Sequence, residues 1–393
     1  MWNMINIVYS GLAVIFYWYF YIKTKDKLNP FSVFLFICTK PYQYLICRLI
    51  FEGFQFDAAD IIILNHFEGA FDFVCKLKQS GIWNQVYFID DSKLNQFSSV
   101  LNPVKKIFFY NNWRKYLPNI EINYDDYDSL YFAHDGVATE YAVMRNFKRD
   151  GKAAIIYEEG YGNYVNINTH KYLKSFLKEF SHLFNIPGSY IGRLKFVDKI
   201  LLQYPDIVIK SRLPIAKKVD KLPMSLDKFL GNAKIQKELF ELFPCTLNFS
   251  SASEIFLILG ETFNSEIDYI NFIENTIQLV QTNLRAGSVI IFKPHPGETQ
   301  DYSISHRKNL VVIPKNLPIE MLYIYGLRNC KKLCIYTYGS TAAINLYMML
   351  RNVCKPEIII LTSNKIPYKD EIAFIRFREL AKNLNVKYRT LKI

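Results

Sequence analysis

Two adjacent glutamates follow a short apolar run in the first half of the chain. Residues 152–157 (KAAIIY) are predicted to form a buried strand, and Glu158, Glu159 and Gly160 come directly after it. Two neighbouring carboxylates at the end of one strand repel each other unless they face different ways. One of them can then act as a general base towards a substrate hydroxyl, while the other makes structural hydrogen bonds. A solvated acidic turn is the alternative for this pair alone.

A histidine lies between two prolines in the sequence KPHP. The run before it, SVIIF at 288–292, is predicted to be a buried strand that ends near Lys293, because proline cannot donate to a sheet ladder. His295 and Pro296 then lie on a stiff turn at the carboxyl end of that strand. Ligands of open α/β sheets bind outside this edge. A surface turn with an incidental histidine is the alternative for this stretch alone.

A strand-to-helix turn rich in hydroxyls follows at residues 336–350, YTYGSTAAINLYMML. The chain turns at Gly339, and either Ser340 or Thr341 can cap the helix that begins there. Free N–H groups, the positive end of the helix dipole and the hydroxyls together favour a phosphate. A plain helix cap is the alternative, but the nearby His295 favours phosphate binding.

Three further residues lie where predicted elements begin or end. Glu320, in NLPIEMLY, is placed at the start of a helix, and Gly260 and Glu261 follow the predicted strand 254–259. The sequence DYD at 126–128 formally matches a metal-binding DxD motif, but it precedes a strand and is interpreted as a polar turn.

Strand-like and helix-like segments alternate along the chain, which predicts parallel sheets covered on both faces. We predict an α/β fold of the GT-B type, with two Rossmann-like domains facing a cleft and an N-terminal hydrophobic helix before them. The predicted parts are residues 1–27, an anchor or hydrophobic helix; 30–245, the acceptor-side domain; 250–365, the nucleotide-donor domain; and 366–393, a C-terminal helix that closes the fold.

The N-terminal segment predicts a membrane anchor. Residues 5–22 carry no charged side chain, and as a helix they would span about 27 Å, close to the thickness of a hydrocarbon core. Lysines follow at 23, 25 and 27, so the positive-inside rule places the rest of the chain at the cytoplasmic face of the cell membrane. A buried or interfacial hydrophobic helix is the alternative.

The amino-acid composition and the net charge indicate which kinds of molecule the protein could bind. The 393 residues are 50% hydrophobic and carry a net charge of +12, which suits anionic partners such as nucleotides or acidic glycans. No zinc-knuckle or RNP-like motif occurs, so nucleic acid is not expected. The seven cysteines are an odd number without a metal-binding pattern, so we expect free thiols and no metal site.

YEEG, KPHP and YGSTAAINL, in this order, resemble the three signatures of bacterial GT-B sialyltransferases. FLFICTKPYQYLICRLI, at 34–50, resembles the opening strand and helix of glycosyltransferase family 52, the lipooligosaccharide and capsule sialyltransferases. The polysialyltransferases of family 38 carry a similar set and are the second choice. The resemblance covers most of residues 32–350.

The resemblance implies an inverting transfer of sialic acid from CMP-sialic acid to a hydroxyl of a cell-surface glycan or glycolipid, without a metal or other cofactor. It matches Glu158 to the general base, with Glu159 and Glu261 as rivals, and His295 to the group that binds the CMP phosphate and acts as general acid. It also implies a donor-binding set: Ser340 and Thr341 at the phosphate, Glu320 at the ribose, Lys293 near the cytidine, Gly260 beneath the nucleotide, and Pro296 and Gly339 in the two loops.

Two other interpretations remain. Transferases that use CDP-glycerol or CDP-ribitol share this architecture and typically use a first-domain histidine as base, for which His66 and His134 are candidates; another nucleotide-sugar donor is also open. A non-catalytic scaffolding protein is disfavoured because the acidic pair and His295 are both present. Glu68 and Asp135 are weaker acceptor-side candidates, and a homodimer is left open.

Overall fold

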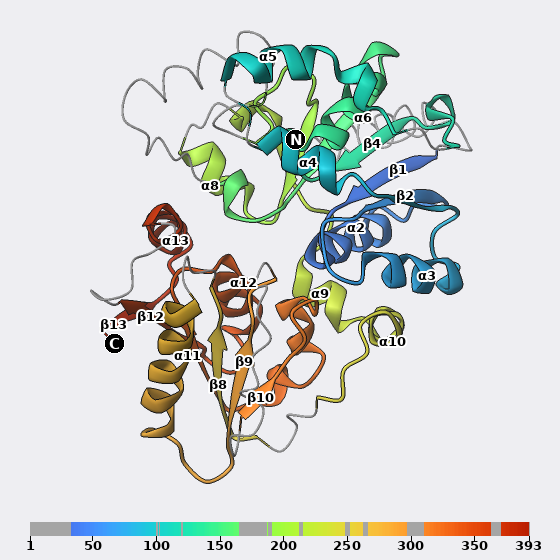
Figure 1. Cartoon of the computed structure of the whole chain (residues 1–393). Coiled ribbons are helices and arrows are strands. Elements are labelled where there is room, and N and C mark those ends of the chain that lie inside the picture. The colour runs from blue at the N-terminus through green and yellow to red at the C-terminus, as the bar shows by residue number, and fades with distance from the viewer. Residues whose placement is uncertain are drawn as a thin grey trace, which may run out of the picture.

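The computed structural model describes residues 33–99, 101, 103–118, 121–164, 187, 191–211, 215–247, 252–261, 266–296, 310–362 and 371–392. Two parallel sheets form two halves of the molecule, which are joined by the helices α9 (Leu226–Gly231) and α10 (Ala233–Leu242). Figure 1 shows the first half in blue to green and the second in gold to red.

The first sheet has seven strands in the order β3-β2-β1-β4-β5-β6-β7. Residues of β1 and β2 are buried throughout, as expected for apolar strands covered on both faces. The strands are β1 (Phe34–Cys38), β2 (Ala59–Leu64), β3 (Val86–Ile89), β4 (Ser129–Phe132), β5 (Ala153–Tyr157), β6 (Lys199–Leu202) and β7 (Val219–Lys221). Its helices are α2 (Pro41–Gly53), α3 (Ala70–Ser80), α4 (Ser92–Ser99), α5 (Pro103–Asn111), α6 (Ala138–Arg149) and α8 (Pro205–Lys210).

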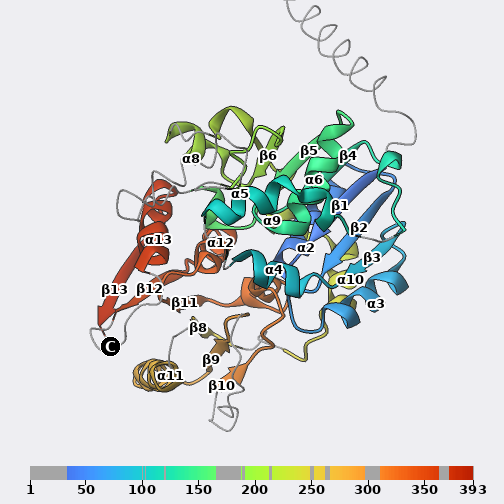
Figure 2. The same ribbon diagram turned by 45° about the horizontal axis from the view of Figure 1, so that its top comes forward.

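The second sheet has six strands in the order β10-β9-β8-β11-β12-β13. They are β8 (Glu254–Leu259), β9 (Ser288–Lys293), β10 (Leu310–Val312), β11 (Lys332–Thr337), β12 (Glu357–Thr362) and β13 (Tyr388–Lys392), with α11 (Glu266–Gln281), α12 (Thr341–Leu350) and α13 (Glu371–Asn383). Figure 2 shows α11 on the side of the second half that faces away from the first sheet. The helix α13 contacts the short 3-10 helix η3 (Tyr161–Asn163), so the C-terminal segment reaches the first half.

Both sheets have a point at which the order of the strands reverses. In the first sheet β1 pairs with both β2 and β4, and in the second β8 pairs with both β9 and β11. Ligands of open parallel sheets bind in the crevice at the carboxyl ends of such strand pairs. Lys40 and His134 follow β1 and β4, while Gly260 and Gly339 follow β8 and β11, so three of the predicted candidates, His134, Gly260 and Gly339, lie at these two positions.

The prediction of an α/β fold with two parallel sheets is confirmed. The strands β6, β7 and β13 were not predicted, and the helix expected at 168–183 lies outside the described residues.

The prediction of a membrane anchor, and of a position at the cytoplasmic face of the membrane that rested on it, is corrected. No helix in the described ranges is long and apolar enough to cross a bilayer. Residues 1–27, where the hydrophobic helix was expected, lie outside those ranges.

Candidate active site

Glu158, the first residue after β5, is 1% exposed and has partners for both of its carboxylate oxygens. Oε1 accepts from Gln203 Nε2 at 3.0 Å and from the Tyr42 hydroxyl at 3.4 Å. Oε2 accepts from the Gln203 backbone N–H at 2.7 Å and from the Tyr164 hydroxyl. Burial raises the pKa of Glu158, and these donors offset that effect only in part. Its carboxyl group therefore ties β5 to the residues that follow β6.

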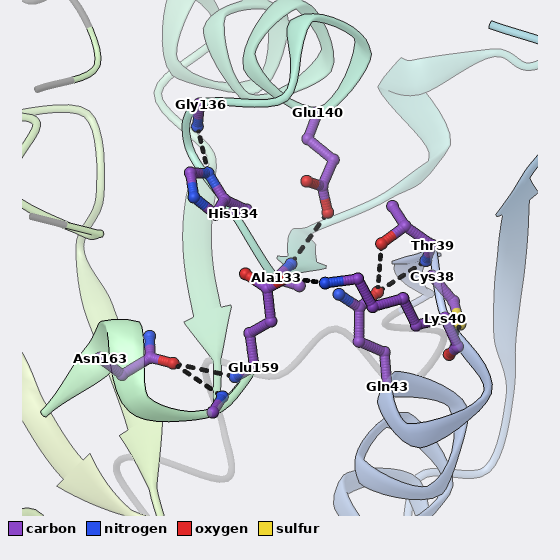
Figure 3. Close-up of polar contacts among 11 residues, drawn as sticks. Cys38, Thr39, Lys40, Gln43, Ala133, His134, Gly136, Glu140, Glu159 and Asn163 are labelled. Atoms are coloured by element: carbon purple, nitrogen blue, oxygen red, sulfur yellow. Dashed lines mark hydrogen bonds and ion pairs between the residues drawn. The ribbon is translucent and has the colours of Figure 1, made fainter. Parts of the chain in front are cut away.

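Glu159 is held in a different way. Lys40 Nζ donates to Glu159 Oε1 at 2.6 Å, and Asn163 Oδ1 accepts from the backbone N–H groups of Glu159 and Gly160 at 2.9 and 3.3 Å (Figure 3). Burial acts to raise the pKa of Glu159, but the charges of Lys40 and of protonated His134 outweigh it, so the pKa is lowered. The two adjacent acids thus have opposite pKa shifts.

Two buried side chains hold the ends of the neighbouring strands. Gln43 Oε1 accepts from the Thr39 backbone N–H at 2.6 Å, and Glu140 Oε1 accepts from the Ala133 backbone N–H at 3.0 Å. Burial, together with the nearby Glu159 carboxylate, raises the pKa of Glu140 well above its usual range. Sequence analysis did not single out Gln43 or Glu140, because polar residues near helix starts are ordinary.

His134 follows β4, and the backbone fixes the state of its ring. Its Nδ1 accepts from the Gly136 backbone N–H at 2.7 Å, so the neutral ring carries its proton on Nε2 (Figure 3). His134 is close enough to Glu159 for its charge to act on that carboxylate.

The second half presents a helix N-terminus at the end of β11. Gly339 has φ 149°, in the region that favours glycine, and Thr337 Oγ1 accepts from the backbone N–H groups of Gly339 and Ser340 at 3.1 and 2.9 Å. Ser340 is the N-cap of α12, and its Oγ accepts from the Ala342 backbone N–H at 3.3 Å. Thr341 is the first residue of the helix. The turn thus carries two hydroxyls beside the positive end of the α12 dipole, which favours an anion.

The KPHP loop packs directly on Gly260. The Gly260 backbone N–H donates to Lys293 O at 2.8 Å, and a Cβ added to Gly260 would lie 3.0 Å from His295 N and from Lys293 O. A side chain therefore cannot be accommodated at residue 260 unless the loop moves. His295 is partly exposed on this loop, and Pro296 after it is exposed.

Lys293 and Glu320 form a buried pair of titratable groups. Lys293 is 6% exposed, and its Nζ donates to Lys315 O at 2.6 Å and to Pro294 O at 3.0 Å. Glu320, on the 3-10 helix η6 (Ile319–Tyr323), accepts from Asn345 Nδ2 at 2.9 Å. Burial lowers the pKa of Lys293 to about 7 and raises the pKa of Glu320 to about 7.

The acidic loop of the first half contacts the helix N-terminus of the second half. Gly160 has φ 144°, and a Cβ added to it would lie 3.7 Å from Thr341 Oγ1. A carboxylate and a helix N-terminus suited to an anion thus lie on opposite sides of one interface.

The remaining candidates lie apart from this contact or have structural partners. His66 Nε2 is 2.7 Å from Asp91 Oδ1, and Thr139 donates to the other oxygen of Asp91. Asp135 is buried and accepts from the Gly192 backbone N–H at 2.9 Å, so it holds a loop. Glu68 is ion-paired with Lys315 of the second half, Glu261 is half-buried beside Gly260, and Asp126 of the DYD sequence ends the 3-10 helix η2 (Tyr124–Asp126).

Two expectations concern metals and cysteines. Within the described ranges, no group of three or more His, Cys, Asp or Glu side chains is arranged to hold a metal ion. All seven cysteines are free thiols.

The sequence profile described as alpha-2,8-polysialyltransferase matches residues 34–347. No curated protein sequence matches the chain. The glycotransferase of kitacinnamycin has 11% identity and a TM-score of 0.52 over 93% of this chain and 87% of that chain, which supports the GT-B fold alone.

Two further structures are similar at lower scores. UDP-GlcNAc 2-epimerase from Neisseria meningitidis has 11% identity and a TM-score of 0.47 over 90% of both chains. MurG from Acinetobacter baumannii has 11% identity and a TM-score of 0.42 over 92% of this chain and 86% of that chain.

The profile confirms the prediction of a bacterial sialyltransferase and corresponds to the second of the two families that the motifs resemble. Since it spans most of the chain, from residue 34 to residue 347, the protein belongs to the alpha-2,8-polysialyltransferase family and is a GT-B glycosyltransferase.

Proposed function

We propose that the protein is an inverting sialyltransferase that moves sialic acid from CMP-sialic acid to a hydroxyl of a surface glycan, such as lipooligosaccharide or capsule, without a metal ion. The observation that carries this proposal is the contact between Gly160 and Thr341, where an added Cβ would lie 3.7 Å from the Thr341 hydroxyl. It places the acidic loop against the helix N-terminus that would receive the phosphate.

The second half binds the donor. The positive end of the α12 dipole and the hydroxyls of Ser340 and Thr341 hold the CMP phosphate, and His295 assists its departure as general acid. Glu320 holds the ribose hydroxyls. Lys293 keeps the KPHP loop in shape rather than touching the cytidine, because its Nζ is engaged by Pro294 O and Lys315 O.

Glu159 is the general base in this proposal, in place of Glu158. The expectation for Glu158 rested on its being the first acid of the pair, but both of its oxygens have protein partners and burial raises its pKa. Glu159 is 17% exposed, and the charge of Lys40 keeps it ionised. Glu261 is the weaker rival because it lies in the donor half, beside Gly260.

The reaction is a single displacement. The acceptor oxygen attacks the anomeric carbon while its proton passes to Glu159, and the bond from that carbon to the phosphate oxygen breaks on the opposite face. CMP departs with the electron pair, and the helix N-terminus, the hydroxyls and His295 stabilise the charge that develops on its phosphate. Because these groups come from the chain itself, no metal is needed for that charge.

A second candidate function, transfer from a CDP-polyol, is favoured by one observation. Asp91 lies 2.7 Å from His66 Nε2 and thereby orients a first-domain histidine, which that chemistry would use as base.

The test is binding and turnover with the full-length protein. Titration calorimetry with CMP, CDP and UDP in EDTA should show that CMP binds most tightly, and CMP-sialic acid should release CMP slowly in water. Binding of CDP or UDP but not CMP would overturn the proposal and move the search to CDP-polyol or UDP-sugar donors.

A further inference from the structure

Lys40 makes a contact that links distant parts of the first half. It follows β1 at the reversal point of the first sheet, and its Nζ reaches Glu159 Oε1, 119 positions further along the chain, at 2.6 Å. The Lys40 side chain is 56% exposed, while that of Glu159 is 17% exposed. The Lys40 charge therefore lies at the outer side of the carboxylate.

We propose that Lys40 is the positioning residue of the base: it holds the Glu159 carboxylate in place and in its ionised form. This inference rests on the proposed function, in which Glu159 accepts the proton of the acceptor hydroxyl. An exposed ion pair of this kind contributes little to folding stability. We infer that the ion pair acts instead on the orientation and the protonation of the Glu159 carboxylate.

The backbone on both sides of this ion pair is held in place. Gln43 Oε1 accepts from the backbone N–H of Thr39 at 2.6 Å and from its hydroxyl at 2.9 Å, immediately before Lys40. On the other side, Asn163 Oδ1 accepts from the Glu159 backbone N–H at 2.9 Å. The two charged side chains therefore extend towards each other from held positions (Figure 3), as a preorganised site requires.

Lys40 makes the ion pair with Glu159, and three further titratable groups lie near that carboxylate. His134, after β4, has Nδ1 occupied by the Gly136 backbone N–H, and a proton there would break that hydrogen bond. Glu140, on α6, is buried, and burial raises its pKa well above its usual range. Glu158, the preceding residue, is also buried and has a raised pKa.

The experiment compares Lys40→Met, Lys40→Arg and Lys199→Met with wild type. Lys199 lies at the start of β6 and makes an exposed ion pair with Asp220 at 3.1 Å, so it is a matched control without a role at the site. The measurement is kcat and KM for release of CMP from CMP-sialic acid across roughly pH 5 to pH 9, together with the Kd for CMP.

We expect Lys40→Met to lower kcat by about tenfold or more on the acid side of the profile and to move the acid limb to higher pH, because the neutral methionine no longer favours the ionised form. The Kd for CMP should stay within about twofold of the wild-type value, since the donor site is in the other half. Lys40→Arg keeps the positive charge, so the acid limb of its kcat profile should lie close to that of wild type. Lys199→Met should have the same kcat profile as wild type.

An acid limb in Lys40→Met that coincides with that of wild type overturns the inference. Failure of the proposed function has a different signature, because Glu159→Gln would then retain turnover, or CMP-sialic acid would not be a donor. If Lys40→Met fails to fold, Lys40→Gln replaces it, since glutamine is also neutral and keeps a polar side chain. An acid limb shifted to higher pH in Lys40→Gln then supports the inference, and an acid limb that coincides with that of wild type contradicts it.

Discussion

Tyr42 of the first half and Asn345 of the second are joined by a hydrogen bond in which Asn345 Nδ2 donates to the Tyr42 hydroxyl at 3.4 Å. The same hydroxyl donates to Glu158 Oε1, and Asn345 also donates to Glu320 Oε1 at 2.9 Å. Two buried carboxyl groups, one behind the proposed base and one in the donor half, thus share a polar bridge across the interface.

The first prediction concerns the proposed base. Glu159→Gln should reduce kcat for CMP release by about 10² to 10⁴, the usual contribution of a general base, and leave the Kd for CMP within about twofold of wild type. Steady-state kinetics and calorimetry measure the two effects. The matched control is Glu140→Gln, which should keep most of the activity, because burial favours the neutral form of Glu140 and the glutamine oxygen still accepts from Ala133. Near-normal turnover in Glu159→Gln would move the base to Glu158 or Glu261.

The second prediction separates the two adjacent acids by stability. Glu158→Ala should lower the free energy of unfolding by about 2 to 4 kcal/mol, because it leaves the half-buried Gln203 N–H and the buried Tyr164 hydroxyl without their acceptor and opens a cavity. Urea denaturation measures the loss. Glu159→Ala should cost less than about 1 kcal/mol, because its partner Lys40 is exposed and can be hydrated. Equal losses in the two variants would contradict this division of roles.

The fold was largely predictable because its long strands are continuous apolar runs. β2 and β8 are buried at every position, and such runs are typical of a parallel sheet covered on both faces. β6 and β7 escaped prediction because they are short, and β7 is exposed at two of its three residues. β13 was not predicted because its sequence is largely polar. It is an edge strand, and Arg389 and Thr390 are exposed.

The candidate site was predictable in position but not in the roles of its residues. Strand ends and turn residues placed Glu158, Glu159 and Gly339 at the correct edges. Nothing in the sequence indicated which glutamate has protein partners for both carboxylate oxygens, because two of those partners, Tyr42 and Gln203, come from segments far away in the chain. The partnership of Lys40 with Glu159 was hidden for the same reason.

The third prediction is a dependence of stability on pH. The folded-state pKa of Glu320 is about 7, raised from 4.5 chiefly by burial. The folded state therefore binds more protons than the unfolded state between these values. The stabilisation conferred by protonated Glu320 is complete below about pH 4.5 and is lost as pH rises through about 7, by at most about 1.4 kcal/mol per pH unit.

Urea denaturation of wild type and Glu320→Gln across this window measures the effect. Glutamine still accepts from Asn345 and does not titrate, so the free energy of unfolding of the variant should fall less steeply with pH across this window than that of wild type. Lys293, whose pKa is lowered to about 7, contributes in the opposite sense and mainly above pH 7, because its neutral form is favoured in the folded state. Identical slopes in the two proteins between about pH 5 and pH 7 would exclude Glu320 as the titrating group.

The fourth prediction concerns the loop that carries His295. Gly260→Ala should weaken binding of CMP by about tenfold and lower the free energy of unfolding by about 1 to 3 kcal/mol, because the new Cβ would lie 3.0 Å from two backbone atoms, His295 N and Lys293 O. Backbone cannot rotate away as a side chain does, so the KPHP loop must shift. Gly231→Ala is the matched control, since an added Cβ meets nothing within 4 Å there and should leave affinity and stability near wild type. Calorimetry and denaturation of the two variants measure both quantities, and a Gly260→Ala protein that binds CMP as wild type does would show that the position of this loop does not govern donor binding.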